Sequence, residues 1–148
     1  MVPGSADGER RAAVAIAITG ASGAVYATRT LAALLARRVH VELIVSDYGR
    51  RLLRDELGEQ ASVERLHDFL AAKYGDAVAG GTFTLHSNRD LGATIASGSH
   101  GCSGMAIVPC SMKTLDDLAD FIAGKILSAL GFEHDLYPPW TGQVASGR

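Results

Sequence analysis

The amino-acid sequence predicts an α/β protein built on parallel strands, and three observations support this. Residues 13–18 form a short, continuous apolar run, which is typical of a buried parallel strand. A glycine-rich turn follows at once, and apolar residues then recur at helical spacing across 24–35. Residues 39–46 repeat the strand pattern, and a second helical pattern follows at 47–57. Strand and helix patterns that alternate in this way are typical of a sheet with helices on its faces.

The first strand ends in the turn Thr19-Gly20-Ala21-Ser22-Gly23, which is a candidate binding element. Its two glycines tolerate positive φ angles and let a ligand approach the backbone closely. The serine offers a hydroxyl and a helix N-cap. The backbone N–H groups at the start of the next helix form an anion site, most often one for phosphate. The G-x-x-G spacing differs from the G-x-G-x-x-G dinucleotide fingerprint, so a turn that binds nothing is the alternative.

Length and charge limit the possible classes of protein. With 148 residues, 47% of them hydrophobic and 20% charged, the chain is long enough for one domain with a core. We expect residues 1–11 to form a flexible N-terminal tail and residues 12–148 to form a single domain. A net charge of −2 without a basic run argues against a nucleic-acid partner.

The same composition predicts a cytoplasmic protein without a metal site. No apolar run is long enough to cross a bilayer, and the first strand lacks the features of a signal peptide. Cys102 and Cys110 fit a reduced compartment better than a disulfide scaffold. Neither these cysteines nor the five histidines have the spacing of metal ligands.

The second unit places Ser46 at the end of its strand. Ligands of open α/β sheets bind at that edge, so Ser46 is a candidate cofactor contact, and a cap of the next helix is an equally good interpretation. Within that helix, the pattern alone treats Glu56 as a solvated side chain. A further helix is predicted over 63–74, followed by a loop at 75–81.

The remaining units supply more hydroxyl groups at predicted strand ends. After a short extended piece at 83–86, residues 94–96 lead as a strand into the small polar turn 97–99. A buried strand then ends at Pro109 and opens into the polar loop 110–114. Several hydroxyl-bearing turns at one sheet edge suit a phosphorylated, planar cofactor better than any single turn does.

Taken together, the motifs resemble those of the flavin prenyltransferases, the UbiX/Pad family. The resemblance rests on ITGASGAVY at the first turn, IVS at the second strand end, IASGS at the third and VPCSMKTL at the fourth. The segment LDDLADFIAGKILSALGFEHDLYPPWTG is similar to that family's closing helix and extended C-terminal arm. The match runs in order over nearly the whole chain beyond the N-terminal tail.

This resemblance implies a homo-oligomeric, metal-independent flavoprotein with a three-layer, doubly wound parallel sheet of the Rossmann-like or flavodoxin-like type. Members transfer a dimethylallyl group from dimethylallyl phosphate to reduced FMN, forming bonds at flavin N5 and C6. The prenylated FMN serves UbiD-type decarboxylases, in ubiquinone synthesis or aromatic-acid metabolism.

The resemblance also assigns roles to individual residues. Ser22 and Glu56 match positions implicated in the chemistry, and Lys125 matches a basic residue for the prenyl phosphate. For proton transfer at the second flavin carbon, a partly buried Glu56 with a raised pKa beside Ser22 is chemically suitable. The implied FMN contacts are Gly20, Ala21, Ser22, Ser46, Ser97, Ser111, Met112, Lys113 and Thr114.

The sequence departs from the family pattern between Thr114 and Leu115. In the family, the S-M-K-T loop precedes a helix and two further strand–helix units, on the order of 60 residues, before the closing helix. We therefore expect a sheet narrowed by an internal deletion, with apolar faces exposed or recruited into an oligomer. Whether the segment is truly absent or omitted from the sequence stays open.

Three other functions are alternatives. The first is an FMN-binding remnant of the family without catalysis, and the second is a phosphopantothenoylcysteine decarboxylase-like flavoprotein. The third, a short-chain NAD-dependent dehydrogenase, requires a Tyr-x-x-x-Lys pair, which the sequence lacks.

Overall fold

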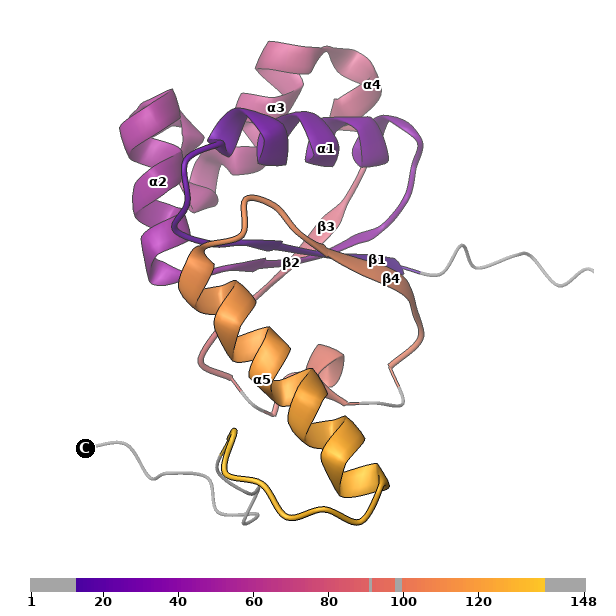
Figure 1. Cartoon of the computed structure of the whole chain (residues 1–148). Coiled ribbons are helices and arrows are strands. Elements are labelled where there is room, and N and C mark those ends of the chain that lie inside the picture. The colour runs from indigo at the N-terminus through magenta and orange to yellow at the C-terminus, as the bar shows by residue number, and fades with distance from the viewer. Residues whose placement is uncertain (1–12, 91, 98–99, 138–148) are drawn as a thin grey trace, which may run out of the picture.

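The computed structural model describes residues 13–90, 92–97 and 100–137, and its centre is a four-stranded parallel sheet (Figure 1). The strands are β1 (Ala13–Ile18), β2 (Val41–Val45), β3 (Phe83–His86) and β4 (Cys102–Ile107). Their order across the sheet is β3-β2-β1-β4, and every neighbouring pair is parallel. The chain thus builds outward from β1 to β3 and then returns past β1 to add β4. This is the α/β fold with a parallel sheet that the sequence predicts.

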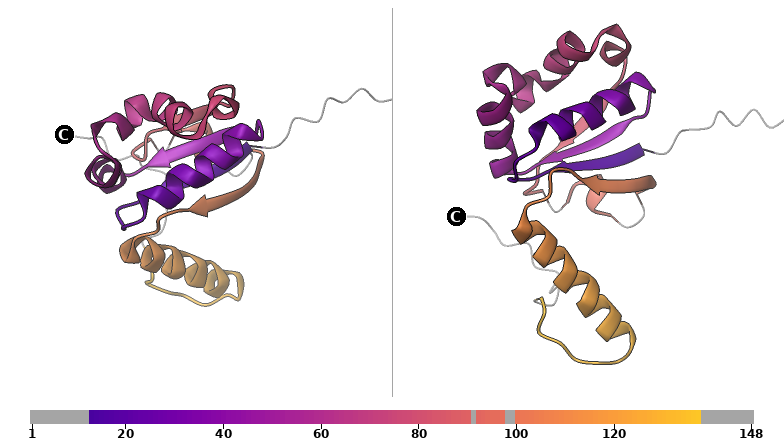
Figure 2. Two further views of the ribbon diagram at one scale, coloured as in Figure 1. Left: turned by 90° about the horizontal axis from the view of Figure 1, so that it is seen from above. Right: turned by 45° about the horizontal axis from the view of Figure 1, so that its top comes forward.

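Helices cover one face of the sheet. They are α1 (Ala24–Ala36), α2 (Asp47–Leu57), α3 (Leu66–Tyr74) and the single turn α4 (Asp76–Ala79), with short 3-10 turns at Glu59–Ala61 and Val63–Arg65. Figure 2 shows these helices stacked on the same side of the strands. The buried side chains between the two layers form the core, which includes Ile16, Ile18, Leu31, Leu35, Leu43, Leu53, Leu66 and Leu70.

The two faces of the sheet differ because side chains alternate along each strand. In β1, the valine and two isoleucines point into the core, whereas Ala13, Ala15 and Ala17 point to the other face, which we call the open face. The register carries this alternation across the sheet, since Ala15 pairs with Glu42 on one side and with Met105 on the other. The open face is therefore a row of alanines bordered by larger side chains.

Below the open face lie the crossover from β3 to β4 and helix α5 (Met112–Ala129) (Figure 1). The crossover contains a 3-10 turn, η3 (Thr94–Ala96). Helix α5 starts at the end of β4 and diverges from the sheet, and Gly124 is its only buried residue among those described. No helix in the described part of the chain is long and apolar enough to cross a membrane.

Four element predictions are wrong. The last strand, expected to be buried and to end at Pro109, is β4, which is exposed along most of its length and ends at Ile107, because no helix in the described structure covers it. Residues 94–96 form a 3-10 turn and not a strand, because this stretch passes beneath the sheet and does not join its edge. The loop at 75–81 contains α4, which begins after Gly75, whose φ of 95° ends α3. The polar loop 110–114 is mostly the first turn of α5, because Ser111 caps that helix.

The structure leaves two predicted segments untested. The N-terminal tail, 1–11, and the C-terminal arm from residue 138 onward lie outside the described residues.

Candidate functional site

The carboxyl ends of β1, β2 and β4 meet at one edge, where the order of strands reverses. Crevices at such a reversal are where open α/β sheets bind ligands. Thr19 joins two of the ends, since its N–H and its hydroxyl donate to the Pro109 carbonyl at 3.1 and 2.9 Å. The Ser111 N–H donates to the Thr19 hydroxyl at 2.7 Å, and the Ser46 N–H donates to the Ile18 carbonyl at 3.0 Å. The predicted convergence is therefore met for the turns after β1, β2 and β4, but not for Ser97, which was expected at the same edge.

At the start of α1, the predicted anion site holds a side chain of the chain itself. The Glu56 carboxylate accepts hydrogen bonds from the Ala24 N–H at 2.8 Å and from the Gly23 N–H at 3.2 Å. The Ser22 side chain also hydrogen-bonds to it. The turn and α2, more than thirty residues apart in sequence, are therefore connected, and the two residues with predicted chemical roles are brought together.

The expected environment of Glu56 is wrong. Its side chain is exposed, and its pKa lies below the ordinary value of 4.5. The Ala24 N–H and then the Ser22 hydroxyl stabilise the ionised form, with a smaller effect from the Gly23 N–H, and together they outweigh burial, which acts to raise the pKa. Glu56 is thus an ionised carboxylate at neutral pH, and the same hydrogen bonds make it a weaker base than an ordinary glutamate.

The glycine turn packs tightly against α2. A Cβ atom added to Gly20 would lie 2.5 Å from the Cβ of Tyr48, so no larger residue fits there without movement of α2. Gly23 has a φ of 127°, which glycine adopts readily. The residues Tyr48 and Tyr26, which lie beside this turn, are 75% and 69% exposed. Sequence reasoning missed both rings, because only the fold brings residue 48 next to residue 20.

Ser46 caps α2, and its hydroxyl accepts a hydrogen bond from the Gly49 N–H at 3.0 Å. The capping interpretation of Ser46 is therefore confirmed, and its contact with a cofactor stays a prediction.

The S-M-K-T residues occupy the first turn of α5 at the same edge. The Ser111 hydroxyl accepts from the Thr114 N–H at 3.3 Å and hydrogen-bonds to the Thr114 hydroxyl at 2.8 Å. Met112 and Lys113 are exposed, and the Lys113 ammonium pairs with the Asp117 carboxylate at 2.6 Å. The edge thus carries several hydroxyls, a helix N-terminus and one lysine.

Two predicted site residues lie elsewhere. Ser97 follows η3 in the crossover, and the neighbouring Ile95 and Ala96 line a cavity under the open face. Lys125 lies thirteen residues beyond the start of α5, about 20 Å along its axis, with its ammonium 5.4 Å from the centre of the Phe121 ring. Within one copy of the chain, neither residue is brought to the edge with Ser22.

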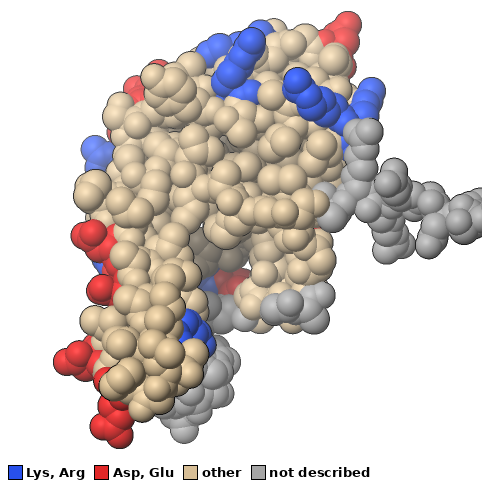
Figure 3. Space-filling model, turned by 45° about the vertical axis from the view of Figure 1, so that its right-hand side comes forward, with Lys and Arg blue, Asp and Glu red and all other residues tan. Residues whose placement is uncertain are grey.

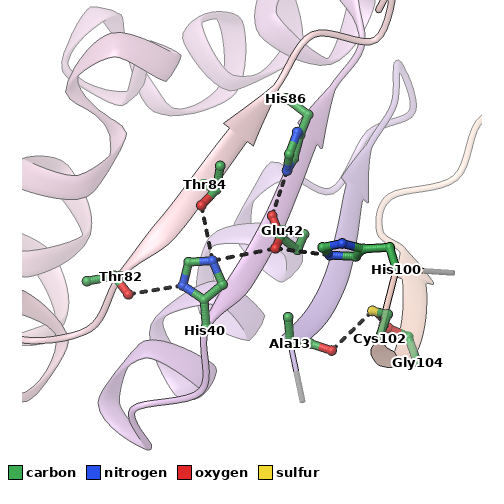
Figure 4. Close-up of polar contacts among 9 residues, drawn as sticks. All are labelled: Ala13, His40, Glu42, Thr82, Thr84, His86, His100, Cys102 and Gly104. Carbon is green, nitrogen blue, oxygen red and sulfur yellow. Dashed lines mark hydrogen bonds and ion pairs between the residues drawn. The ribbon is translucent and has the colours of Figure 1, made fainter. Parts of the chain in front are cut away.

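A second polar cluster lies on the open face, around Glu42 of β2 (Figure 4). Glu42 is only 7% exposed, and its carboxylate accepts from the ring nitrogens of His86 at 2.6 Å and His100 at 3.3 Å. The His40 ring lies 3.7 Å away. Burial acts to raise the pKa of Glu42, but the hydrogen bonds from His86 and His100 and the charges of the nearby rings lower it overall. No arrangement of His, Cys, Asp and Glu among the described residues could hold a metal ion.

Next to this cluster the open face is hollowed. A cavity of about 380 Å³ lies between the sheet, η3 and the segment that enters β4. It is mostly apolar, and its lining includes Ala15, Ile44, Ile95, His100, Cys102 and Met105.

Comparison with known proteins identifies similar chains. Residues 4–130 match the family model described as Flavoprotein. The flavin prenyltransferase UbiX of a Synechocystis species is 36% identical over 114 residues, which cover 76% of this chain and 55% of that protein. The UbiX of Methanothermobacter thermautotrophicus is 27% identical over 198 residues, which cover 88% of this chain and 96% of that protein. The chain spans about half the length of several curated relatives that it matches.

Solved structures agree with this similarity. The structure of AnUbiX in complex with FMN and dimethylallyl pyrophosphate is 29% identical, with a TM-score of 0.58 over 78% of this chain and 53% of that one. A dodecameric FMN-dependent UbiX-like decarboxylase from Escherichia coli O157:H7 is 28% identical, with a TM-score of 0.56 over 81% of this chain and 62% of that one.

Proposed function

Because this chain belongs to the flavoprotein family, we propose that it binds FMN at the edge formed by the carboxyl ends of β1, β2 and β4. The donor set at that edge fits the cofactor. Hydroxyl groups of Ser46, Ser111 and Thr114 suit a phosphate, and the first turn is solvent-exposed at Gly20, where a flat ring can reach it.

The position of Glu56 sets the orientation of the cofactor. Its carboxylate already holds the N-terminus of α1, so a phosphate there would meet a like charge. The first turn of α5 carries Lys113 and no such carboxylate bonded to its backbone in the described structure. We therefore assign the phosphate to Ser46 and to residues 111–114, and the flavin ring to Gly20, Ala21 and Ser22.

The proposed reaction is transfer of a dimethylallyl group from dimethylallyl phosphate to reduced FMN, with release of inorganic phosphate. It is supported by relatives named flavin prenyltransferases and by a similar structure that holds FMN and dimethylallyl pyrophosphate. Reduced FMN supplies the nucleophilic ring. The protein's own groups position the base: Ser22 and the two backbone N–H groups orient the Glu56 carboxylate, and Glu56 takes up the proton that ring closure releases. The observation that carries the proposal is this contact between Ser22 and Glu56 at the proposed flavin edge.

FMN titration of the purified chain tests the binding site. We expect Lys113→Ala to weaken FMN binding about tenfold, because it removes a charge-assisted contact to the phosphate. Lys73→Ala is the matched control, since Lys73 is an exposed lysine of α3 on the helical layer. Equal affinities of the two variants would overturn the phosphate assignment, and no saturable binding by the parent chain would overturn the flavin site.

A second candidate function is binding of FMN without prenyl transfer. It is favoured by the length of the chain, which covers 55% of the Synechocystis relative, and by Lys125, which lies far from Ser22. An assay that follows the flavin spectrum after dimethylallyl phosphate and a reductant are added distinguishes prenyl transfer from FMN binding alone. Spectral conversion supports the enzyme, and a saturated but unchanged flavin supports the binding protein.

The proposal has four further parts: a missing segment, a homo-oligomer, a recipient of the product and a location in the cell. We propose that a segment of the family pattern is missing, because the alignment with the Methanothermobacter relative runs over 198 positions and nearly all of that protein. The order of the sequence motifs is the reason for placing it between Thr114 and Leu115. We also propose a homo-oligomer, for which the dodecameric neighbour is the support, and a UbiD-type decarboxylase as recipient of the product. The free thiols of Cys102 and Cys110 support a cytoplasmic location.

A further inference from the structure

The proposed reaction, on which this inference rests, needs a positive charge beside the departing phosphate. When the allylic C–O bond breaks, its electron pair leaves with the phosphate, and a fixed cation stabilises that charge. Lys125, which the resemblance assigns to this phosphate, lies about 20 Å along α5 from the edge. Lys113 lies at the edge, but it pairs with Asp117 and is assigned to the phosphate of FMN. A further cation is therefore required at the edge.

The charge around Lys125 is also unfavourable for a phosphate. Helix α5 and the segment up to residue 137 carry five acidic side chains and two lysines. Figure 3 shows acidic groups along the outer surface of this helix, whereas basic side chains gather over the helical layer on the other face of the sheet. Within one copy, an anion is therefore repelled from the far end of α5.

Arg89 is a cation at the edge that sequence reasoning missed. It follows the end of β3 by three residues, and because the strands are parallel, the loop after β3 lies at the same edge as the start of α2 (Figure 1). Its guanidinium donates a hydrogen bond to the Asp47 carboxylate at 2.5 Å. Asp47 is the first residue of α2, directly after Ser46. The ion pair thus holds a guanidinium beside a residue already assigned to the cofactor.

Tyr48 connects this ion pair to the glycine turn. It follows Asp47 directly, and its Cβ lies 2.5 Å from where a Cβ on Gly20 would be, so α2 and the turn are in close contact there. Because Tyr48 is 75% exposed, it offers an aromatic surface next to the proposed flavin contacts. A prenyl phosphate has an apolar end and an anionic end, and Tyr48 and Arg89 offer a surface for each.

Arg89 keeps the capacity to bind an anion. Its side chain is 77% exposed, and its contact with Asp47 engages the nitrogen Nη2. A guanidinium has several N–H donors that point in different directions, so it can bridge a carboxylate and a phosphate. The hydrogen bond to Asp47 raises the pKa of Arg89, which keeps the group charged. Since both partners are exposed, the pair adds little to stability, and variants of Arg89 should fold.

We propose that Arg89 binds the phosphate of dimethylallyl phosphate at the carboxyl edge. Asp47 positions the guanidinium, and Tyr48 contacts the prenyl group. The site then takes a phosphate monoester of a short, branched apolar alcohol. Unlike Glu56, which occupies the N–H donors at the start of α1, Asp47 leaves a donor group between itself and the incoming phosphate.

Calorimetric titration of dimethylallyl phosphate into the FMN-loaded chain tests the proposal, with the flavin kept oxidised so that no transfer occurs. We expect Arg89→Ala to weaken binding about tenfold, because a charge-assisted contact is lost, and to leave FMN affinity unchanged. Arg89→Lys keeps the charge and should recover part of the loss. Arg51→Ala is the matched control, since Arg51 forms a similarly exposed ion pair with Asp55 at 3.1 Å, and it should bind as the parent does.

A comparison with Asp47→Asn separates phosphate binding from a merely structural tie between the loop and α2. That variant breaks the same ion pair but keeps the guanidinium, so we expect a smaller loss of affinity than in Arg89→Ala. Equal losses in the two variants, or equal affinities of Arg89→Ala and the parent chain, would overturn the role of Arg89 and leave the FMN site intact. No saturable FMN binding by the parent chain would instead overturn the proposed function, and this inference with it.

Discussion

Glu56 is the residue on which the proposed chemistry depends. Since glutamine keeps a hydrogen-bond acceptor but loses the charge, we expect Glu56→Gln to retain FMN binding. Turnover with dimethylallyl phosphate should fall by about 100-fold or more, because a positioned general base contributes at least that much. The measurement is FMN affinity beside the rate of spectral conversion, with Glu59→Gln, an exposed glutamate beyond α2, as control.

Loss of both affinity and turnover in Glu56→Gln would instead make Glu56 a structural cap of α1.

The lowered pKa of Glu56 also predicts how turnover depends on pH. Because the pKa of Glu56 is below 4.5, the proton-accepting form persists through neutral pH and is lost only at acidic pH.

Glu42 carries a separate, pH-dependent contribution to stability. Its pKa is lowered in the folded state, so its stabilising effect is present above the unfolded pKa and is lost as pH falls through the folded pKa. We expect Glu42→Gln to reduce the free energy of unfolding by about 1–3 kcal/mol at pH 7, the usual loss at a buried, charged hydrogen-bond partner.

Urea unfolding at pH 7 and at pH 4 measures this effect, with Glu59→Gln again as control. The difference between the parent chain and Glu42→Gln should shrink at the lower pH, as the carboxylate takes up a proton. A difference that stays constant between the two pH values would contradict the assigned role of the carboxylate.

At residue level, the sequence predicts which residues come together better than it predicts the surroundings that set their pKa. The resemblance pairs Ser22 with Glu56, and the structure brings them into contact. The direction of the Glu56 pKa was not predictable, because it depends on backbone N–H groups at residues 23 and 24, which only the fold places beside residue 56. The Glu42 cluster has the same origin, since its histidines come from three separate segments.

Among the elements, α2 is positioned by a single glycine. Gly49 is buried in its first turn, and an added Cβ would collide with the carbonyl oxygen of Ile18. Helix propensity alone favours alanine by about 1 kcal/mol, but we expect Gly49→Ala to destabilise the protein by about 1–3 kcal/mol, because overpacking forces the helix away from the sheet.

Denaturant midpoints of Gly49→Ala and of Gly101→Ala test this prediction. A Cβ at Gly101 meets nothing within 4 Å, so that variant should be close to neutral. Stabilisation by Gly49→Ala would mean that α2 can move away from β1 without cost, and the close approach at Gly20 would then lose its significance.

The sequence pattern predicts best those elements that have strong periodicity and pack well in the fold. The strand at 13–18 has its predicted bounds, and α2 matches its predicted range, because Ser46 caps it and Gly58 follows it. The prediction for 94–96 fails because a β-branched pair without a neighbouring strand does not form a ladder. The start of α5 within the predicted polar loop follows from Ser111, whose capping role outweighs the polar character of its neighbours.

For the whole molecule, exposed apolar surface is the main consequence of a four-stranded sheet. Large apolar side chains remain exposed on β4 and all along α5, and such patches mark interaction surfaces. If association covers them, the melting temperature must rise with protein concentration. We expect this dependence in the parent chain and its loss in Leu118→Asp/Ile122→Asp, as measured by thermal unfolding across a hundredfold range of concentration. A concentration-independent melting temperature in the parent chain would count against association.

The anchoring of α5 at one end has a mechanical consequence. The helix is about 27 Å long at 1.5 Å per residue, and the hydrogen bond from Ser111 to Thr19 fixes its first turn to the sheet. A tilt of the helix would therefore pivot about its first turn, at the proposed phosphate site. A tilt that sweeps Leu130 through several ångströms leaves Ser111 and Thr114 almost stationary, so the far end can adapt to a neighbour while the cofactor edge keeps its geometry.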